Sequence, residues 1–132
     1  MALLAEIGQH LDDEGRGTQG TDIFLGDMPD SPANVITVYE YLGVEPTQCM
    51  GSSGTAPSVE HPRIHVLVRN STYNGAVTVA DAVFDDLHWF KGTLSGVVYK
   101  LIQASQRPFS LGRDEDNNAR LACNYRIMKD PS

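Results

Sequence analysis

The sequence predicts an α+β fold: a small mixed sheet of about five strands with two helices packed on one face, in a single domain spanning residues 1–132. The main observation is a strand–helix–strand succession between residues 61 and 104. In its first strand, residues 63–69, polar positions alternate with apolar ones, which are Ile64, Val66 and Val68. This period of two is typical of a strand with one buried face.

The helix of this unit is expected over residues 77–90, because apolar residues recur there on one stripe: Ala76, Val79, Ala80, Val83, Phe84, Leu87 and Phe90. Thr78 and Asp81 have the spacing of a capping box, and Asn74 is an alternative cap. Gly92, preceded by Lys91, is expected to end the helix. A strand over residues 97–104 follows. Whether it runs parallel to strand 63–69 is left open, although a helical crossover allows it.

The flanking elements complete the sheet. In order, we expect a helix over 2–13, a connector at 15–20, a strand over 21–25, a loop at 26–32, a strand over 35–42, a long loop at 43–62, a polar loop at 105–118 and a closing strand over 120–128. In the closing strand, apolar residues alternate with polar ones and are expected to face the core: Leu121, Cys123, Tyr125 and Ile127.

Composition limits the function classes. Hydrophobic residues make up 41% of the chain, which is typical of a globular domain. The net charge of −7 argues against a protein whose main function is to bind the phosphates of nucleic acid. The N-terminus lacks a basic region and Glu6 interrupts its apolar residues, so we expect no secretory signal, and no apolar run is long enough for a membrane span. Cys49 and Cys123 are expected to be reduced thiols of an intracellular product.

The long loop over residues 43–62 contains Cys49, Met50, Ser52 and Ser53, and a loop of this length is usually functional or disordered. Its Gly-Ser-Ser-Gly run has neither the spacing of a nucleophile elbow nor the lysine of a phosphate loop. No local signature supports Cys49 as a nucleophile. We therefore read the run as a flexible loop.

Two patterns that suggest metal binding fail on inspection. His61 and His65 are four residues apart, but on a strand they stand about 13 Å from each other. Asp114 begins a stretch that imitates a calcium loop, yet Ala119 and Tyr125 occupy the positions that need Gly and Glu. The sequence thus predicts no catalytic, cofactor-binding or metal-binding residue.

Trp89 and Phe90 are adjacent, so on a helix their side chains diverge by about 100°. We expect Phe90 to be a core residue. Trp89 lies off the apolar stripe and is a candidate to pack under a loop or on a partner.

Three features together resemble the tail terminator (tail completion, minor capsid) proteins of long-tailed bacteriophages. The first is the order of elements over almost the whole chain. The second is the segment 62–69, which reads Pro-Arg-Ile-His-Val-Leu-Val-Arg and is followed by Tyr73 and the amphipathic helix. The third is the segment 108–115, Pro-Phe-Ser-Leu-Gly-Arg-Asp-Glu, which leads into the closing strand.

The resemblance implies a structural virion protein of the tail and neck, assembled in the host cytoplasm, that uses no cofactor and touches no membrane. Such proteins form a ring, commonly a hexamer, on the tail tube, stop its polymerisation and receive the head connector. DNA would pass through the lumen without specific binding, and part of the negative charge is expected to line it.

The candidate axial contacts to the tube or the connector are the two loops, at 43–60 and 106–118. The second loop contains Phe109, Arg113, Asp114 and Glu115. Deleting residues 47–58 is expected to leave the fold intact and impair joining.

Two other classes stay open on the sequence alone. One is a neighbouring neck component, such as a head completion or connector-adaptor protein, because such proteins have a similar size and also assemble as rings. The other is a small enzyme or ligand-binding α+β domain, because a fold does not fix a function.

Overall fold

The computed structural model describes residues 2–29, 33–47 and 59–130. The elements are α1 (Ala2–Asp13), β1 (Ile23–Leu25), β2 (Val35–Thr47), β3 (Val59–Asn70), α2 (Tyr73–Leu87), β4 (Phe90–Leu94), β5 (Val97–Ala104), β6 (Phe109–Arg113) and β7 (Ala119–Lys129). None of the helices in these described ranges is both long and apolar enough to cross a bilayer.

The strands form one curved sheet in the order β1-β2-β3-β7-β5-β4. Among the strand pairs of the described residues, only β1–β2 is parallel. Because β7 pairs antiparallel with both β3 and β5, those two strands run parallel to each other with β7 between them. Strand β6 pairs with the first part of β7, beyond the end of β5. The sheet is therefore mixed, as expected, but has seven strands rather than about five.

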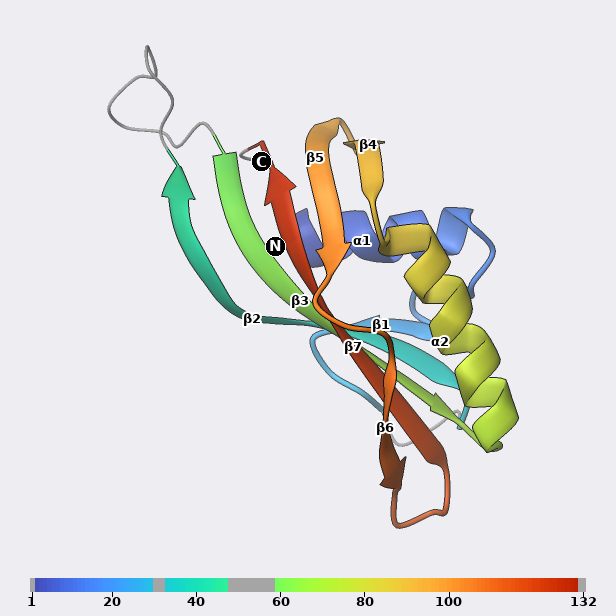
Figure 1. Cartoon of the computed structure of the whole chain (residues 1–132). Coiled ribbons are helices and arrows are strands. Elements are labelled where there is room, and N and C mark those ends of the chain that lie inside the picture. The colour runs from blue at the N-terminus through green and yellow to red at the C-terminus, as the bar shows by residue number, and fades with distance from the viewer. Residues whose placement is uncertain (1, 30–32, 48–58, 131–132) are drawn as a thin grey trace.

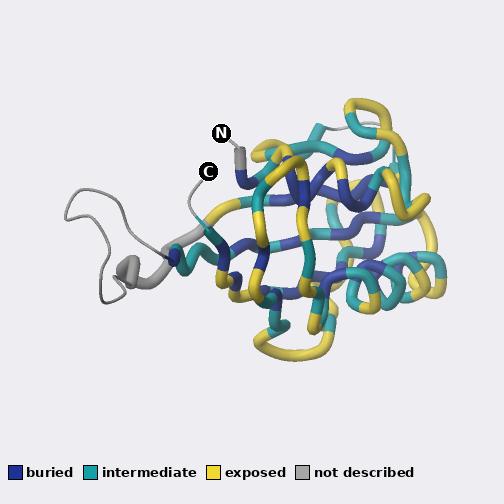
Figure 2. The backbone as a smooth tube through the Cα atoms, turned by 90° about the horizontal axis from the view of Figure 1, so that it is seen from above, coloured by how far each residue is buried: buried dark blue, intermediate teal, exposed yellow. Residues whose placement is uncertain are grey.

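Both helices pack on the same face of the sheet, which confirms the predicted fold class (Figure 1). The two helices and the facing strands share one apolar core. Its largest fully buried apolar side chains include Ile7 and Leu11 of α1, Ile64 of β3 and Leu87 of α2. Buried positions lie between the helices and the sheet, while the turns at the ends of the strands are exposed (Figure 2). The face of the sheet away from the helices is called the helix-free face below.

The second helix begins and ends earlier than expected. Its N-cap is Thr72, whose hydroxyl accepts a hydrogen bond from the Gly75 N–H at 3.1 Å. Thr78 lies inside the helix and donates to the Asn74 carbonyl instead. A helix starting at residue 77 was therefore wrong, because an extended Thr72 was the better cap for the same apolar stripe.

At its other end the helix stops at Leu87 rather than residue 90. Trp89 adopts a left-handed conformation with φ of 64° and donates its N–H to the Ile102 carbonyl at 2.7 Å. This turn starts the β4–β5 hairpin, so Phe90 packs on the core from a strand. Gly92 pairs with Tyr99 in that hairpin and does not end the helix.

Two predicted loops were too long. Strands β2 and β3 extend to Thr47 and Val59, so only residues 48–58 of the predicted 43–62 loop lie between them, and these fall outside the described residues. The predicted loop 105–118 contains β6. All five β6 residues are exposed, so this strand has no period-two burial pattern by which it could be recognised.

A buried charge cluster joins α1 to the end of β7. Lys129 is 1% exposed and Glu6 is 5% exposed, and the Lys129 Nζ lies 3.4 Å from the Glu6 Oε1. The Tyr99 hydroxyl donates to the same carboxylate oxygen. Burial, and next the bond to Glu6, raise the pKa of Tyr99. Buried groups of this kind depend on each other, because each satisfies a polar group that water cannot reach.

Lys129→Met is expected to lower the free energy of unfolding by about 3–5 kcal/mol, because it leaves the buried Glu6 carboxylate without its cation. Urea denaturation measures the loss. The double variant Glu6→Gln, Lys129→Met removes both charges and should cost less than Lys129→Met alone. A double variant that costs as much as the two single changes added together would contradict this coupling.

Candidate interaction surfaces

The helix-free face carries arginines at matching positions of two neighbouring strands. Arg63 of β3 pairs in register with Arg126 of β7, and six residues along β3 Arg69 pairs with Arg120. Like charges directly opposite each other on two strands destabilise the pair. Twice on one face, therefore, the register places two arginines on directly facing residues.

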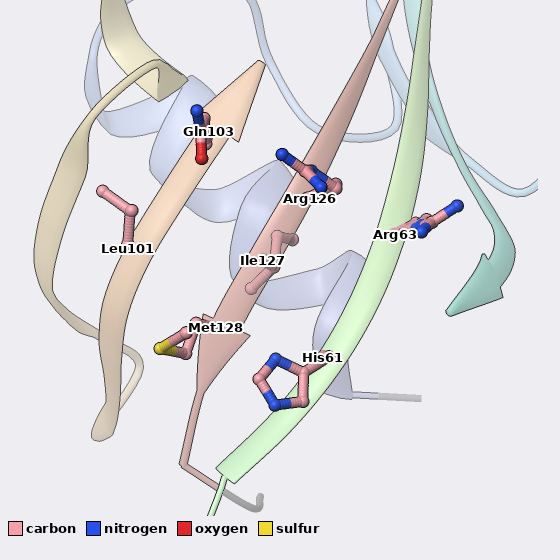
Figure 3. A pocket seen from close by; sticks show the side chains of 7 residues that line it. All are labelled: His61, Arg63, Leu101, Gln103, Arg126, Ile127 and Met128. Atoms are coloured by element: carbon pink, nitrogen blue, oxygen red, sulfur yellow. The ribbon is translucent and has the colours of Figure 1, made fainter. Parts of the chain in front are cut away.

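A cleft of about 310 Å³ opens around the first of these pairs. It is lined by side chains from β3, β5 and β7: His61, Arg63, Leu101, Gln103, Arg126, Ile127 and Met128 (Figure 3). Arg126 lies in the middle, with Arg63 across from it on one side and Gln103 on the other. We call this feature the cationic cleft. Leu101 and Met128 give it an apolar side.

The cations of the two pairs differ in their partners. Arg69 is buried and donates to the Pro29 carbonyl at 2.7 Å and the Ala33 carbonyl at 3.2 Å, so it has a structural role. Within the described residues, neither Arg63 nor Arg126 forms an ion pair, and the buried Nε of Arg63 has no hydrogen-bond partner. The cationic cleft therefore holds two guanidinium groups whose charge the described part of the subunit does not neutralise.

The helices on the other side of the sheet have the opposite charge. Helices α1 and α2 contain no lysine or arginine, and they contain six carboxylates: Glu6, Asp12, Asp13, Asp81, Asp85 and Asp86. Asp86 pairs with Arg16, and this contact is the first cause that raises the pKa of Arg16. The charges are thus separated across the sheet, with acidic helices on one side and the cationic cleft on the other.

A second feature projects from the start of β7, at the end away from the cationic cleft. Strand β6, the turn over residues 114–118 and the start of β7 form a hairpin that extends past the helices (Figure 1). We call it the arm. Phe109 is 37% exposed and Leu111 is 42% exposed, so the arm presents apolar side chains to solvent. Exposed apolar groups on a projecting hairpin are typical of a contact surface.

Hydrogen bonds fix the tip of the arm. The Asp114 carboxylate accepts from the Asp116 N–H at 3.0 Å and the Asn118 N–H at 2.9 Å. Arg113 donates to the Asn117 carbonyl at 2.7 Å, and Asn117 has a positive φ of 64°. The backbone hydrogen bond from Asn118 is the main cause that lowers the pKa of Asp114. The turn is therefore a defined structure rather than a loose loop.

The structure brings together four of the residues that the sequence singled out. Phe109, Arg113, Asp114 and Glu115 all lie on the arm. Trp89 lies apart from them, 58% exposed at the junction of α2 and β4, with its ring centroid 5.4 Å from that of His88. The remaining candidates fall outside the described residues: Cys49, Met50, Ser52 and Ser53.

Sequence reasoning missed the cationic cleft. Arg63 and Arg126 occupy polar positions of the two predicted alternating strands, but their local sequence did not show that they are neighbours. The sequence pattern that points to the cleft is the equal spacing of arginines in two strands, six residues apart at 63 and 69 and at 120 and 126. Only the antiparallel register turns these spacings into facing pairs. His61, read as a residue before the strand, lies within β3 and lines the cleft.

The described residues offer little for catalysis or metal binding. Among them, no three His, Cys, Asp or Glu side chains are placed to hold a metal ion. Cys123 is a free thiol in the core, and burial raises its pKa, which is the reverse of what a nucleophile needs. His65 faces out from β3, and its Nδ1 lies 2.6 Å from the Asn124 Oδ1.

Comparison with known proteins gives a consistent result. The model of a family described as bacteriophage tail terminator protein matches residues 10–131. A comparison with curated proteins found no match. One similar solved structure is a chain of the virion of a native gene transfer agent particle, with 19% identity, a TM-score of 0.60 and coverage of 98% of this chain and 95% of that one. A second has 12% identity, a TM-score of 0.57 and coverage of 98% and 96%. At these identities the two structures show a shared fold.

The turn at the tip of the arm is expected to depend on the charge of Asp114. Because the folded pKa of Asp114 is lowered, its stabilising effect is fully present above the unfolded value of about 3.9 and is lost as pH falls through the folded value. Amide hydrogen exchange at residues 116 and 118 should therefore accelerate in acid. Asp114→Ala should abolish this pH dependence, whereas Asp116→Ala should keep it. Equal protection at neutral and acid pH would contradict the assignment.

Arg126→Gln is expected to stabilise the isolated subunit by about 0.2–1 kcal/mol, because it removes the repulsion with Arg63. The gain should shrink as salt screens the charges. Thermal or urea unfolding at low and high salt measures it. Arg126→Lys keeps the charge and is the matched control, for which no gain is expected. Destabilisation by Arg126→Gln at low salt would show that the pair is not repulsive.

Proposed function

The chain belongs to the family of bacteriophage tail terminator proteins, and on this premise we propose that it forms a ring at the head-proximal end of the tail tube. There it ends tube polymerisation and joins the tail to the head connector. Membership makes it a structural protein of the virion, in the tail and neck. Its work is done through protein contacts and involves no catalytic step.

One observation carries the proposal: the family match over residues 10–131 takes in almost all of the fold. Both surfaces described above, the cationic cleft and the arm, lie within the matched range. The fold also offers surface for assembly, since among the described strands β6 pairs with β7 on one edge and with none on the other, and its side chains are exposed along its whole length.

A closed ring uses heterologous contacts, in which one patch of each subunit meets a different patch of its neighbour. Six copies of the 14.4 kDa chain would have a mass of about 86 kDa. The partners along the tail axis are the tube protein on one side and the connector or stopper protein on the other. The candidate axial contacts predicted from the sequence are the loops at 43–60, with Cys49, Met50, Ser52 and Ser53, and at 106–118, and Trp89 is a candidate to pack on a partner. The arm that the second loop forms is instead proposed to contact a neighbouring copy.

The lumen of the ring is proposed to be acidic. The chain has a net charge of −7, and its helices carry carboxylates without a lysine or arginine. A negative wall repels the phosphates of DNA, so the genome passes without being held. A ring structure with a basic or neutral lumen would contradict this part of the proposal.

A phage that lacks this protein is expected to assemble tail tubes longer than normal that do not join heads, because nothing ends polymerisation. Electron microscopy of lysates measures tube length. Supplying the wild-type chain from a plasmid should restore normal length and joined particles. Free tails of normal length without the protein would instead indicate a head-side neck component, and infectious particles in unchanged yield would remove the assignment altogether.

A further inference from the structure

We propose that the arm of one copy binds in the cationic cleft of the next copy, with Glu115 at the arm tip between Arg63 and Arg126. This inference rests on the proposed ring and names the contact that builds it. The partner of the cationic cleft is thus a second copy of the same chain, not the tube, the connector or DNA.

The contact has to be made between copies, because the arm cannot reach its own cleft. Both features belong to β7: the turn precedes Ala119 at one end, and Arg126 lies seven residues further along. A strand rises about 3.4 Å per residue, so they are separated by about 24 Å. Strand β7 is hydrogen-bonded on both edges, to β3 on one side and to β6 and then β5 on the other, which keeps it extended.

Charge is the first match between the two surfaces. The cationic cleft holds two guanidinium groups that form no ion pair within the described residues. The arm carries Glu115 and Asp116, both exposed and likewise without an ion pair there, while Asp114 is used to hold the turn. A carboxylate is the group that a pair of guanidinium groups binds best among protein side chains.

The second match is apolar. Phe109 and Leu111 of the arm are exposed, and the cationic cleft is bordered by Leu101 and by Met128, which is 39% exposed. Burying these four side chains against each other would remove apolar surface from water and give the contact affinity, while the charges fix its direction. Each surface therefore offers the complement of the other in both respects.

The acidic helices fit the cleft less well. Three of their carboxylates already face a cation, since Glu6 pairs with Lys129, Asp86 pairs with Arg16 and Asp81 lies 3.9 Å from Arg107. Asp13 accepts a hydrogen bond from Gln9.

The contact gives each copy one arm to donate and one cleft to fill, which is the heterologous pattern of a ring. It also explains why the repulsive pair of Arg63 and Arg126 is present, because a carboxylate from the neighbour turns repulsion into a bidentate site. With these arginines covered, the surface left to face DNA is more acidic than that of the free subunit.

The test uses charge reversals on the two surfaces. Arg126→Glu places a carboxylate opposite the Glu115 of the arm, and Glu115→Lys places an ammonium group opposite Arg126, so neither variant should associate with itself. Association is measured with differently tagged copies, in solution and on purified tail tubes, by co-purification and by native mass. Each reversal should weaken it by at least about tenfold. Lys91→Glu and Glu14→Lys are matched controls, exposed on other elements, and should associate as wild type does.

Mixing the two variants is the decisive step. In the mixture, the lysine introduced by Glu115→Lys faces the glutamate introduced by Arg126→Glu, and the reverse contact is the wild-type one. An equal mixture should therefore assemble with the two variants alternating, and an even-numbered ring permits this alternation. Rescue on mixing cannot arise if Arg126 faces DNA or if Glu115 touches the tube or connector.

The outcomes separate the contact from the ring. Wild-type copies that stay single even on tail tubes would overturn both proposals. A wild-type ring that either reversal leaves intact, or two defective variants that fail to rescue each other while still folded by circular dichroism, would overturn the contact alone. If Arg126→Glu assembles normally but loses binding to duplex DNA, the cleft serves DNA and the inference is wrong.

Discussion

The hydrogen bonding of β7 on both of its edges is the constraint on which the rest of the structure depends. One edge pairs with β3, and the other pairs first with β6 and then with β5. Because side chains alternate along a strand, this single element places Tyr125 and Ile127 in the core and Arg126 on the helix-free face. One end of β7 is anchored by the buried Lys129, and the other end carries the arm.

Stability and assembly make different demands on this strand. The buried cluster of Glu6, Tyr99 and Lys129 ties α1 to the sheet and serves the fold of the single subunit. The facing pair of Arg63 and Arg126 does the reverse, because its repulsion costs the single subunit free energy. A cost of this kind is expected at a contact surface, where a partner supplies the missing charge. The separation of the cationic cleft from the acidic helices also favours assembly over the single subunit, because it leaves surfaces of opposite charge on one chain.

Much of the fold could be predicted from the sequence, because β3 and β7 alternate cleanly and α2 has one apolar stripe. The ends of α2 could not, since the left-handed Trp89 is decided by the hairpin that follows it. Strand β6 gave no burial pattern because all five of its residues are exposed and it joins the sheet by pairing with β7. The arm was identified as a polar loop of interest, whereas the cationic cleft depends on the register that joins Arg63 to Arg126, which local sequence does not encode.

The measurement that tests the central claim most directly is a structure of the protein assembled on its tail tube, at a resolution that shows side chains. The account predicts that the arm of each copy lies in the cationic cleft of its neighbour, with the Glu115 carboxylate within about 4 Å of Arg63 or Arg126. An arm that extends toward the tube or the connector, or a cleft that opens into the lumen, would contradict it.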